Sequence, residues 1–273
     1  MTIVCNMNNT YTNFITSVLQ ATSAIALSYF GKVTGTTKEG DNNQVLTQTD
    51  IEIGQFIIAK IKEIYPDHNI IDEEAGVIDN NSEYTWVIDP IDGTSNFANG
   101  IPLYGIMIGL LQEGAPVAGG IALPYFHEIF TAEKGSGAYC NGEKISITKE
   151  MKLLHSLVAY SIDGHQENPQ FTQDECTVLS RIILNIRNLR DTGSCFDAAM
   201  VAKGKFGAYL NRTGKIWDNV AQQIIIEEAG GVYTDFFGKP MDYSNPLTKA
   251  EDNFTFCAGS PTLHQQLQEI IHA

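Results

Sequence analysis

The sequence predicts a folded globule in which an N-terminal α+β half and a C-terminal α/β half share one hydrophobic core. Residues 101–148 contain short apolar runs separated by turn signals, which is typical of an antiparallel meander. Residues 151–273 alternate between strand and helix patterns, which is typical of α/β layering. Because no linker, repeat or low-complexity tract intervenes, we expect residues 1–273 to form a single unit with halves 1–150 and 151–273.

Two amphipathic helices are expected at the N-terminus. Apolar residues recur at helical spacing over residues 10–30, and Gly31 follows the last of them as a natural stop. A second helix fits residues 50–64 and ends before Pro66, because the residue preceding a proline disfavours helical dihedral angles. The polar residues 31–44 between the two helices are expected to form a mobile loop.

Short strands dominate the rest of the first half, and strands alternate with helices in the second. In the first half we expect strands at residues 70–71, 84–88, 101–111, 116–123 and 128–132, with turns at 113–114, 134–137 and 141–142. In the second half we expect strands at residues 157–160, near 190, 206–211 and 255–257, and helices at 172–186, 195–203, 219–229 and from 261 onward.

The composition excludes several classes of function. The 273 residues hold 17 Lys and Arg against 32 Asp and Glu, a net charge of −15, so a nucleic-acid polymer or an anionic membrane is not an expected partner. The 5 cysteines form no C-x-x-C pair, which argues against a disulfide framework or a zinc knuckle. Without a signal-peptide pattern or a membrane-length apolar run, a cytoplasmic location is expected.

The most informative segment is residues 86–97, which contains Asp89 and Asp92 at the end of an apolar strand. Gly93 and Thr94 then open a short helix whose free N–H groups can receive an anion such as phosphate. Two carboxylates beside an anion site are favourable only if divalent cations lie between them, and hard oxygen ligands suit Mg²⁺. The alternative is that Asp92 is merely a helix N-cap and Asp89 a loop residue.

Further acidic residues follow other apolar segments, and their positions favour a cation site over the interpretation of Asp92 as a cap and Asp89 as a loop residue. Glu73 and Glu74 follow the strand at 70–71, Asp218 begins a helix, and Asp50 opens the second helix. Each alone is compatible with a cap or a solvated charge. Their repeated position after apolar strands indicates that they converge on one site.

These segments, in this order, resemble the inositol monophosphatase family of lithium-sensitive, magnesium-dependent sugar and polyol phosphatases. Residues 86–97 follow the family's W-V-I-D-P-I-D-G-T-x-N-F block. Residues 216–218 with 228–231 resemble its W-D…E-A-G-G signature, Glu73-Glu74 its upstream acidic pair, and residues 193–195 its G-[ST]-A segment. The resemblance implies a layered αβαβα sandwich.

The resemblance also implies the roles of individual residues. The implied metal ligands, for two or three Mg²⁺, are Glu73, Asp89, the Ile91 carbonyl, Asp92 and Asp218. Asp50 and Thr94 correspond to the pair that orients and deprotonates the attacking water, and Glu73 belongs with them in the catalytic set. The implied substrate contacts are Asp92, Gly93, Thr94, Gly193, Ser194, Cys195, Asn211 and Asp218. No phosphoenzyme is required, and the sequence has neither G-x-S-x-G nor H-E-x-x-H.

The implied reaction is Mg²⁺-dependent hydrolysis of a small phosphate monoester, with myo-inositol monophosphate as the leading substrate. Asn211 stands where inositol-specific members carry Glu, so histidinol phosphate, fructose 1,6-bisphosphate, glycerol phosphate and adenosine 3′,5′-bisphosphate stay open, with Arg212 as a possible contact for a second phosphate. A catalytically idle, metal-dependent binding protein is the alternative of another class. The family further implies a homodimer, and a lid over the metals at residues 31–44, where Lys38 and Glu39 suit such a role.

Overall fold

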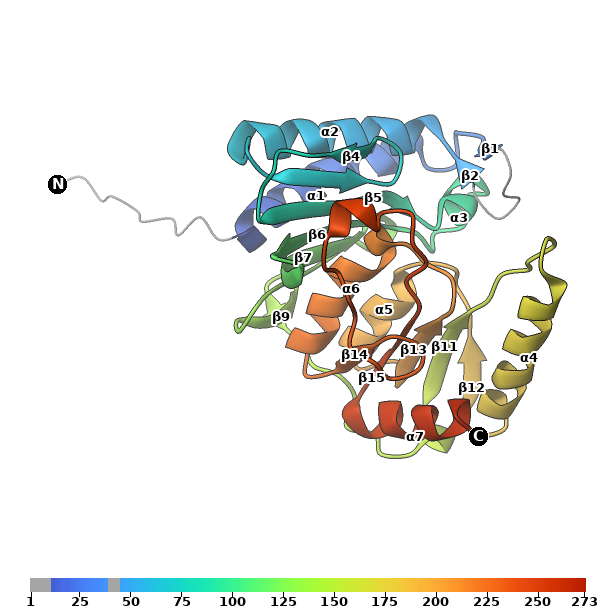
Figure 1. The fold of residues 1–273 in the computed structure, drawn as a ribbon. Helices are drawn as coiled ribbons and strands as arrows, with labels where there is room; N and C mark the ends of the chain where they lie inside the picture. The colour runs from blue at the N-terminus through green and yellow to red at the C-terminus, as the bar shows by residue number, and fades with distance from the viewer. Residues whose placement is uncertain (1–10, 39–44) are drawn as a thin grey trace.

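The computed structural model describes residues 11–38 and 45–273. Five layers alternate between helices and sheets, and their order from the N-terminal pair of helices down to the C-terminal helix is visible in Figure 1. The layered αβαβα sandwich expected from the resemblance is therefore confirmed. Among the described residues, no helix is both long enough and apolar enough to cross a bilayer.

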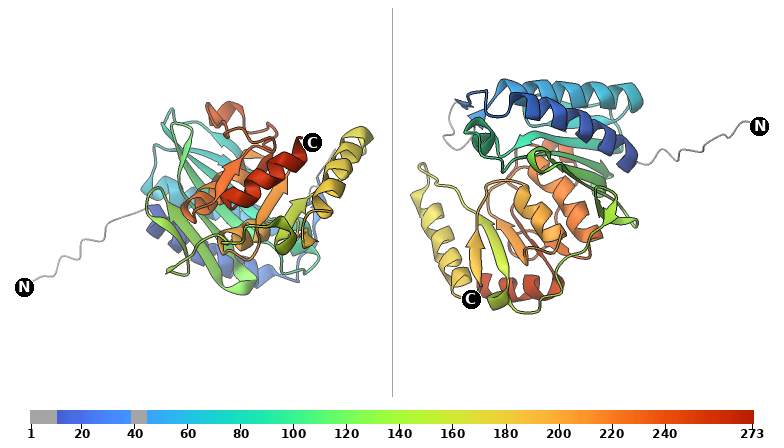
Figure 2. Two further views of the ribbon diagram at one scale, coloured as in Figure 1. Left: turned by 90° about the horizontal axis from the view of Figure 1, so that it is seen from below. Right: turned by 180° about the vertical axis from the view of Figure 1, so that it is seen from behind.

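Helices α1 (Tyr11–Tyr29) and α2 (Gln48–Ile64) form the outermost layer and cover one face of the first sheet (Figure 2). Helix α2 begins earlier than expected because the Thr47 side chain and Asp50 form a reciprocal capping box at its N-terminus. Strand β1 (Thr36–Thr37), within the expected loop, pairs with β2 (Val45–Leu46), just after it, so residues 36–37 are more regular than the sequence indicates. Residues 39–44 of that loop, including Glu39, lie outside the described residues.

The second layer is an eight-stranded sheet whose middle is the expected meander. Its strands are, in spatial order, β10 (Glu143–Lys144), β9 (Gly137–Cys140), β8 (Glu128–Glu133), β7 (Ala115–Leu123), β6 (Gly105–Gln112), β5 (Tyr84–Asp92), β3 (Asn69–Asp72) and β4 (Gly76–Ile78). Neighbours are antiparallel except β3 and β5. Strand β4 was not expected, and β6 begins later than expected, since the Leu103 carbonyl accepts a hydrogen bond from Asn96.

The middle layer consists of α5 (Phe196–Ala202) and α6 (Ile216–Glu228), and α6 packs on the first sheet at very short range. A Cβ atom on Gly109 would lie 2.6 Å from Val220 Cγ1, and one on Gly119 would lie 2.7 Å from Ile224 Cγ2. Glycine in β6 and β7 therefore permits this close approach of helix to sheet. Helix α6 begins at Ile216 rather than at the expected residue 219, because the Asp218 side chain accepts a hydrogen bond from the Lys215 amide and caps the first turn.

The second sheet and the last two helices complete the sandwich. Its strands are, in spatial order, β12 (Asn188–Arg190), β11 (Leu157–Ser161), β13 (Ala208–Asn211), β15 (Phe256–Gly259) and β14 (Val232–Thr234). Strands β12, β11 and β13 are mutually parallel, whereas β15 runs antiparallel to both of its neighbours. Helices α4 (Pro169–Ile183) and α7 (Pro261–Ile271) cover its outer face, and α4 starts before residue 172 because Asn168 caps it and Pro169 opens it.

One buried cluster joins the two halves of the chain. It contains Met107 and Phe130 from the first sheet, Ala199 and Ile224 from the middle helices, and Phe256 from the second sheet. Three short 3₁₀ segments, η1 (Pro124–Phe126), η2 (Leu153–His155) and η3 (Pro246–Thr248), lie in the connections. The shared core positions the ends of both sheets around one cavity. The division of the chain at residue 150 stays a prediction.

Candidate active site

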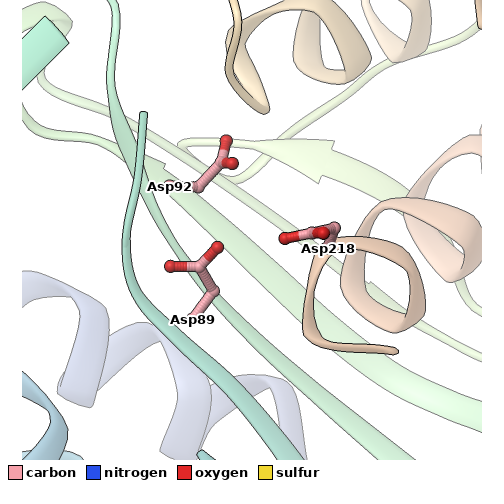
Figure 3. Close-up of side chains that lie close together, drawn as sticks. All are labelled: Asp89, Asp92 and Asp218. Atoms are coloured by element: carbon pink, nitrogen blue, oxygen red, sulfur yellow. The ribbon is translucent and has the colours of Figure 1, made fainter. Parts of the chain in front are cut away.

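Three carboxylates from two elements meet at one point of the molecule. Asp89, Asp92 and Asp218 each offer an oxygen atom, and these atoms lie within 4.8 Å of one another. Figure 3 shows the first two side chains on strand β5 and the third on the first turn of α6, all directed toward a common space. The convergence expected from the sequence therefore exists for these three.

Strand β5 presents two carboxylates three residues apart because it contains a β-bulge. Asp89 pairs with Met107 of β6 and Asp92 with Gly105, and the register shifts between them. The strand expected at residues 84–88 therefore continues to Asp92, because pairing with β6 resumes after the bulge. Asp92 is not a helix cap, since Gly93, with φ of +83°, is the N-cap of α3 (Thr94–Ala98).

Backbone N–H groups fix two of the three carboxylates. The Cys195 amide, in the loop before α5, donates to Asp92 Oδ2. The Lys215 amide donates to Asp218 Oδ2 at 2.6 Å, so Asp218 does act as a cap of α6 with one oxygen. Asp89 Oδ1 is buried and has no hydrogen-bond partner. A capping role therefore accounts for one carboxylate oxygen of Asp218 and does not account for the buried carboxylate of Asp89.

Glu73 extends the acidic group from the neighbouring strand. It follows β3, which runs parallel to β5, and it lines the same cavity as Asp89. The Lys38 ammonium lies 2.9 Å from Glu73 Oε1 and 2.6 Å from Glu74 Oε1. Burial alone would lower the pKa of Lys38, but the two carboxylates raise it above its ordinary value. Lys38 therefore offers Glu73 a positive charge.

The remaining acidic charge has no comparable partner. Burial raises the pKa of Asp92 to about 6 and that of Asp218 to about 7, and neighbouring carboxylates add to both shifts. Burial, together with Glu73, Asp92 and Asp218, raises the pKa of Asp89 well above its ordinary range. Burial also raises the pKa of Glu73 to about 7 despite Lys38. The site holds more negative charge than its own protein environment stabilises.

Asp50 and Thr94 form a hydrogen-bonded pair beside this cluster. The Thr94 hydroxyl lies 3.0 Å from Asp50 Oδ1 and 2.7 Å from the Ile91 carbonyl oxygen. Asp50 is fully buried, its Oδ2 accepts from both the amide and the hydroxyl of Thr47, and burial raises its pKa to about 6. A hydroxyl with one hydrogen and two acceptors can exchange partners, which is a requirement of a proton relay.

The other predicted residues line a cavity of about 660 Å³ that opens over the carboxylates. Six of the predicted substrate contacts line its wall: Gly93, Thr94, Gly193, Ser194, Cys195 and Asn211. A Cβ atom on Gly93 would lie 2.8 Å from Ser194 Cβ, so both its dihedral angle and its surroundings require glycine. Asn211 Oδ1 is occupied by the Thr213 amide at 2.7 Å.

The suggestion that Arg212 contacts a second phosphate is wrong. Its guanidinium stacks on Phe171 at 4.5 Å, and Arg212 does not line the cavity. Phe236 and Phe237 flank it at 5.4 and 5.8 Å. Arg212 comes just after the last residue of β13, and these three aromatic contacts hold its guanidinium away from the cavity.

Two acidic residues of the cavity wall were not found from the sequence. Asp163 follows β11 and Asp191 follows β12, and both line the cavity, as does His165. Their positions depend on the order of parallel strands in the second sheet. For Asp163 the available signal was its location just after an apolar strand, the same signal that singled out Glu73, whereas the strand before Asp191 is polar and gives no such signal.

The donor set fits a hard divalent cation. Asp89 Oδ1 is a buried, unpartnered carboxylate oxygen, and the oxygens around it are crowded and destabilised as anions. Oxygen-only donors suit Mg²⁺ rather than zinc or copper. Because bound cations would supply the missing positive charge, the residues present are compatible with Mg²⁺.

Comparison with known proteins agrees with this geometry. The pattern of the Inositol monophosphatase family matches residues 7–272. The chain is 31% identical over 260 residues to an inositol-1-monophosphatase of Bacillus subtilis, covering 94% of each chain. It is 32% identical over 216 residues to a fructose-1,6-bisphosphatase/inositol-1-monophosphatase of Aquifex aeolicus, covering 77% of each. An IMPase structure from Thermotoga maritima superposes with a TM-score of 0.83 at 27% identity, covering 95% of this chain and 96% of that one. The chain therefore belongs to the inositol monophosphatase family of phosphatases.

Proposed function

We propose that this phosphatase hydrolyses a small phosphate monoester with Mg²⁺ and without a phosphoenzyme, with myo-inositol monophosphate as the leading substrate. The observation that carries the proposal is the uncompensated carboxylate cluster at the floor of the cavity. Glu73, Asp89, the Ile91 carbonyl, Asp92 and Asp218 are the proposed ligands of two or three Mg²⁺. When bound, Mg²⁺ supplies Lewis-acid stabilisation of the phosphoryl group and of the developing negative charge.

Asp50 and Thr94 are proposed to move the proton of the attacking water. Thr94 lines the cavity, and Asp50 lies behind it at 3.0 Å. The Thr94 hydroxyl lies 2.7 Å from the Ile91 carbonyl oxygen and 3.0 Å from Asp50 Oδ1, so rotation of its hydrogen directs it to Asp50. The Thr94 oxygen then has a free lone pair toward the cavity, where it can accept a proton from water while Asp50 takes the hydroxyl proton.

The phosphate is proposed to lie between two loops. Gly93 and Thr94 present amides at the start of α3, and Gly193, Ser194 and Cys195 form the facing loop. The Cys195 amide already holds Asp92, so the facing loop also fixes one proposed metal ligand.

The names of relatives support two substrate classes. The Bacillus subtilis relative is an inositol-1-monophosphatase, and the Aquifex aeolicus relative also carries a bisphosphatase name. Because Thr213 occupies Asn211 Oδ1, the Asn211 amide nitrogen is the group that can donate to a ring hydroxyl, which is compatible with inositol. The outward orientation of Arg212 removes the residue expected to bind a second phosphate.

A panel of phosphate esters at millimolar Mg²⁺ tests the proposal. The panel contains myo-inositol 1-phosphate, glycerol 2-phosphate, histidinol phosphate, fructose 1,6-bisphosphate and adenosine 3′,5′-bisphosphate. Phosphate release that EDTA abolishes and Mg²⁺ restores is expected, and lithium is expected to inhibit it. Absence of release from every ester would favour the idle, metal-dependent binding protein, although all its proposed ligands are present.

A homodimer is proposed as the assembly. Tyr125 and Phe126 are 50% and 40% exposed, and their rings continue a line of contacts from Phe30 to Phe196. An exposed aromatic patch of this kind is typical of a protein interface. Light scattering after gel filtration measures the assembly, and a monomer at micromolar concentration would contradict it. The cytoplasmic location stays a prediction.

A further inference from the structure

Three neighbouring parallel strands of the second sheet end at the cavity. Asp191 directly follows β12, Asp163 lies two residues beyond β11, and Asn211 is the last residue of β13. Because these strands are parallel and adjacent, their carboxyl ends meet at one edge of the second sheet. We call the cavity surface formed by Asp163, Asp191 and Asn211 the distal wall.

The two carboxylates of the distal wall line the same cavity, and both residues are exposed. The pKa of Asp191 lies above its ordinary value because partial burial and the Asp163 carboxylate raise it, while the Gly193 amide lowers it. Asp163 Oδ2 has a weak contact with the Thr213 hydroxyl at 3.3 Å. Neither contact brings a positive charge to this pair.

The cations of the cavity are already paired elsewhere. Of the described residues that line it, only Lys215 and His165 can carry positive charge. Lys215 Nζ contacts the carbonyl and, at 3.3 Å, the carboxylate of Glu251, and His165 Nδ1 lies 3.2 Å from Glu167 Oε1.

Arg212, the nearest further candidate, is held outside the cavity. Its guanidinium stacks on the Phe171 ring at 4.5 Å. Its approach to the distal wall would require it to leave this stack and two further aromatic neighbours. The distal wall therefore keeps an excess of negative charge.

From this excess we infer that the distal wall selects the charge of the leaving alcohol. Between phosphate esters that are otherwise matched, the one whose alcohol carries an ammonium group is the better substrate, and a second phosphate on the alcohol makes an ester a poorer one. The physical reason is Coulombic: a cation beside Asp163 and Asp191 is attracted, and a phosphate there is repelled. The inference rests on the proposed phosphatase activity and narrows its substrate class.

Matched pairs of esters test the ranking. Glucosamine 6-phosphate and glucose 6-phosphate differ only in an ammonium and a hydroxyl group, and fructose 1,6-bisphosphate exceeds fructose 6-phosphate by one phosphate. At low ionic strength we expect kcat/KM to be roughly tenfold higher for the amino sugar, equivalent to about 1.4 kcal/mol. The bisphosphate is expected to rank below its monophosphate by a similar factor.

Neutral variants connect the ranking to the distal wall. Asp163→Asn and Asp191→Asn keep a side-chain acceptor and remove one charge each, so each is expected to reduce the ammonium-to-hydroxyl ratio severalfold. Asp174→Asn, on the exposed face of α4, makes the same charge change away from the cavity and is expected to leave the ratio unchanged. Equal ratios in the parent protein and both variants would overturn the inference, as would a bisphosphate that ranks first.

Failure of the inference and failure of the proposed function are distinguishable. Calorimetry measures the Kd of glucosamine 6-phosphate and glucose 6-phosphate with Mg²⁺ present, whether or not phosphate is released. Tighter binding of the amino sugar, lost in Asp163→Asn, supports the inference in a protein without turnover. Equal Kd values contradict it even if other esters are hydrolysed.

Discussion

The two walls of the cavity use carboxylates in opposite ways. On the metal side, Asp89, Asp92 and Asp218 place oxygens within 4.8 Å, and backbone amides hold two of them in position. On the distal side, Asp163 and Asp191 come from separate strands and share their wall with an asparagine. The close carboxylates on the metal side concentrate negative charge that can bind cations for phosphate hydrolysis. The carboxylates on the distal side come from separate strands and leave room for the alcohol of the substrate. Changes on the metal side should therefore affect kcat, and changes on the distal side should affect the choice of substrate.

The largest expected effect is that of Asp92→Asn on the metal wall. Loss of one anionic ligand removes several kcal/mol of transition-state stabilisation, or about 10³-fold in kcat, measured by phosphate release. The amide oxygen can still accept from Cys195, so the fold should persist. Because a crowded charge is removed, thermal stability without metal should be equal or higher. Activity close to that of the parent would show that Asp92 is not a ligand.

The second effect tests the relay beside the cluster. Thr94→Val keeps the shape of the side chain but removes the hydroxyl that lies 3.0 Å from Asp50. Loss of general-base assistance is expected to lower kcat about 10²-fold with little change in Mg²⁺ affinity. Thr94→Ser restores the hydroxyl and should recover most of the rate. A Thr94→Val variant with normal kcat would exclude the relay.

The same contrast explains what the sequence could predict. Five of the predicted site residues lie within residues 89–94, so one strand and the turn after it bring them together whatever the rest of the fold is. They are Asp89, Ile91, Asp92, Gly93 and Thr94. The bulge at Pro90 could not be predicted, because proline is compatible with either a strand end or a bulge.

The distal wall depends on long-range pairing instead. Asp163 and Asp191 become neighbours only because β12 pairs with β11, and no local pattern specifies that order. The three-residue strands β4 and β14 were also not predicted from the sequence, because a strand of three residues is too short to show a periodic pattern. The direction of Arg212 could not be predicted either, because the aromatic rings that hold it come from distant parts of the sequence.

The third prediction concerns stability, pH and Mg²⁺. The folded-state pKa values are about 6 for Asp92 and about 7 for Glu73 and Asp218, all above the ordinary values near 4 of the unfolded chain. Between about pH 4 and 7 the folded state therefore binds more protons, so the free energy of unfolding of the metal-free protein falls as pH rises.

Magnesium should reverse this loss by binding the ionised carboxylates. At about 100 times its Kd, Mg²⁺ would add about 2.7 kcal/mol, or roughly 5–10 °C in Tm, at pH 8. At pH 5.5 the increase should be smaller, because protons compete for the same oxygens. Differential scanning fluorimetry with and without Mg²⁺ measures both values. An equal Mg²⁺ effect at the two pH values would contradict the assignment of the cluster as the binding site.

The smallest expected effect returns to the distal wall. In the parent protein the Thr213 amide donates to Asn211 Oδ1 at 2.7 Å, and Asn211→Asp keeps an oxygen for this bond. The variant adds a third negative charge to the wall formed with Asp163 and Asp191. One further charge near a solvated surface is worth about 1 kcal/mol or less, so the ammonium-to-hydroxyl ratio in kcat/KM should rise about threefold. The change should reside in KM, since the charge acts on the alcohol rather than on the phosphoryl group. Raising the ionic strength should weaken it, because salt screens exposed charges. A variant that lowers kcat equally for both sugars would show instead that the two walls do not act separately.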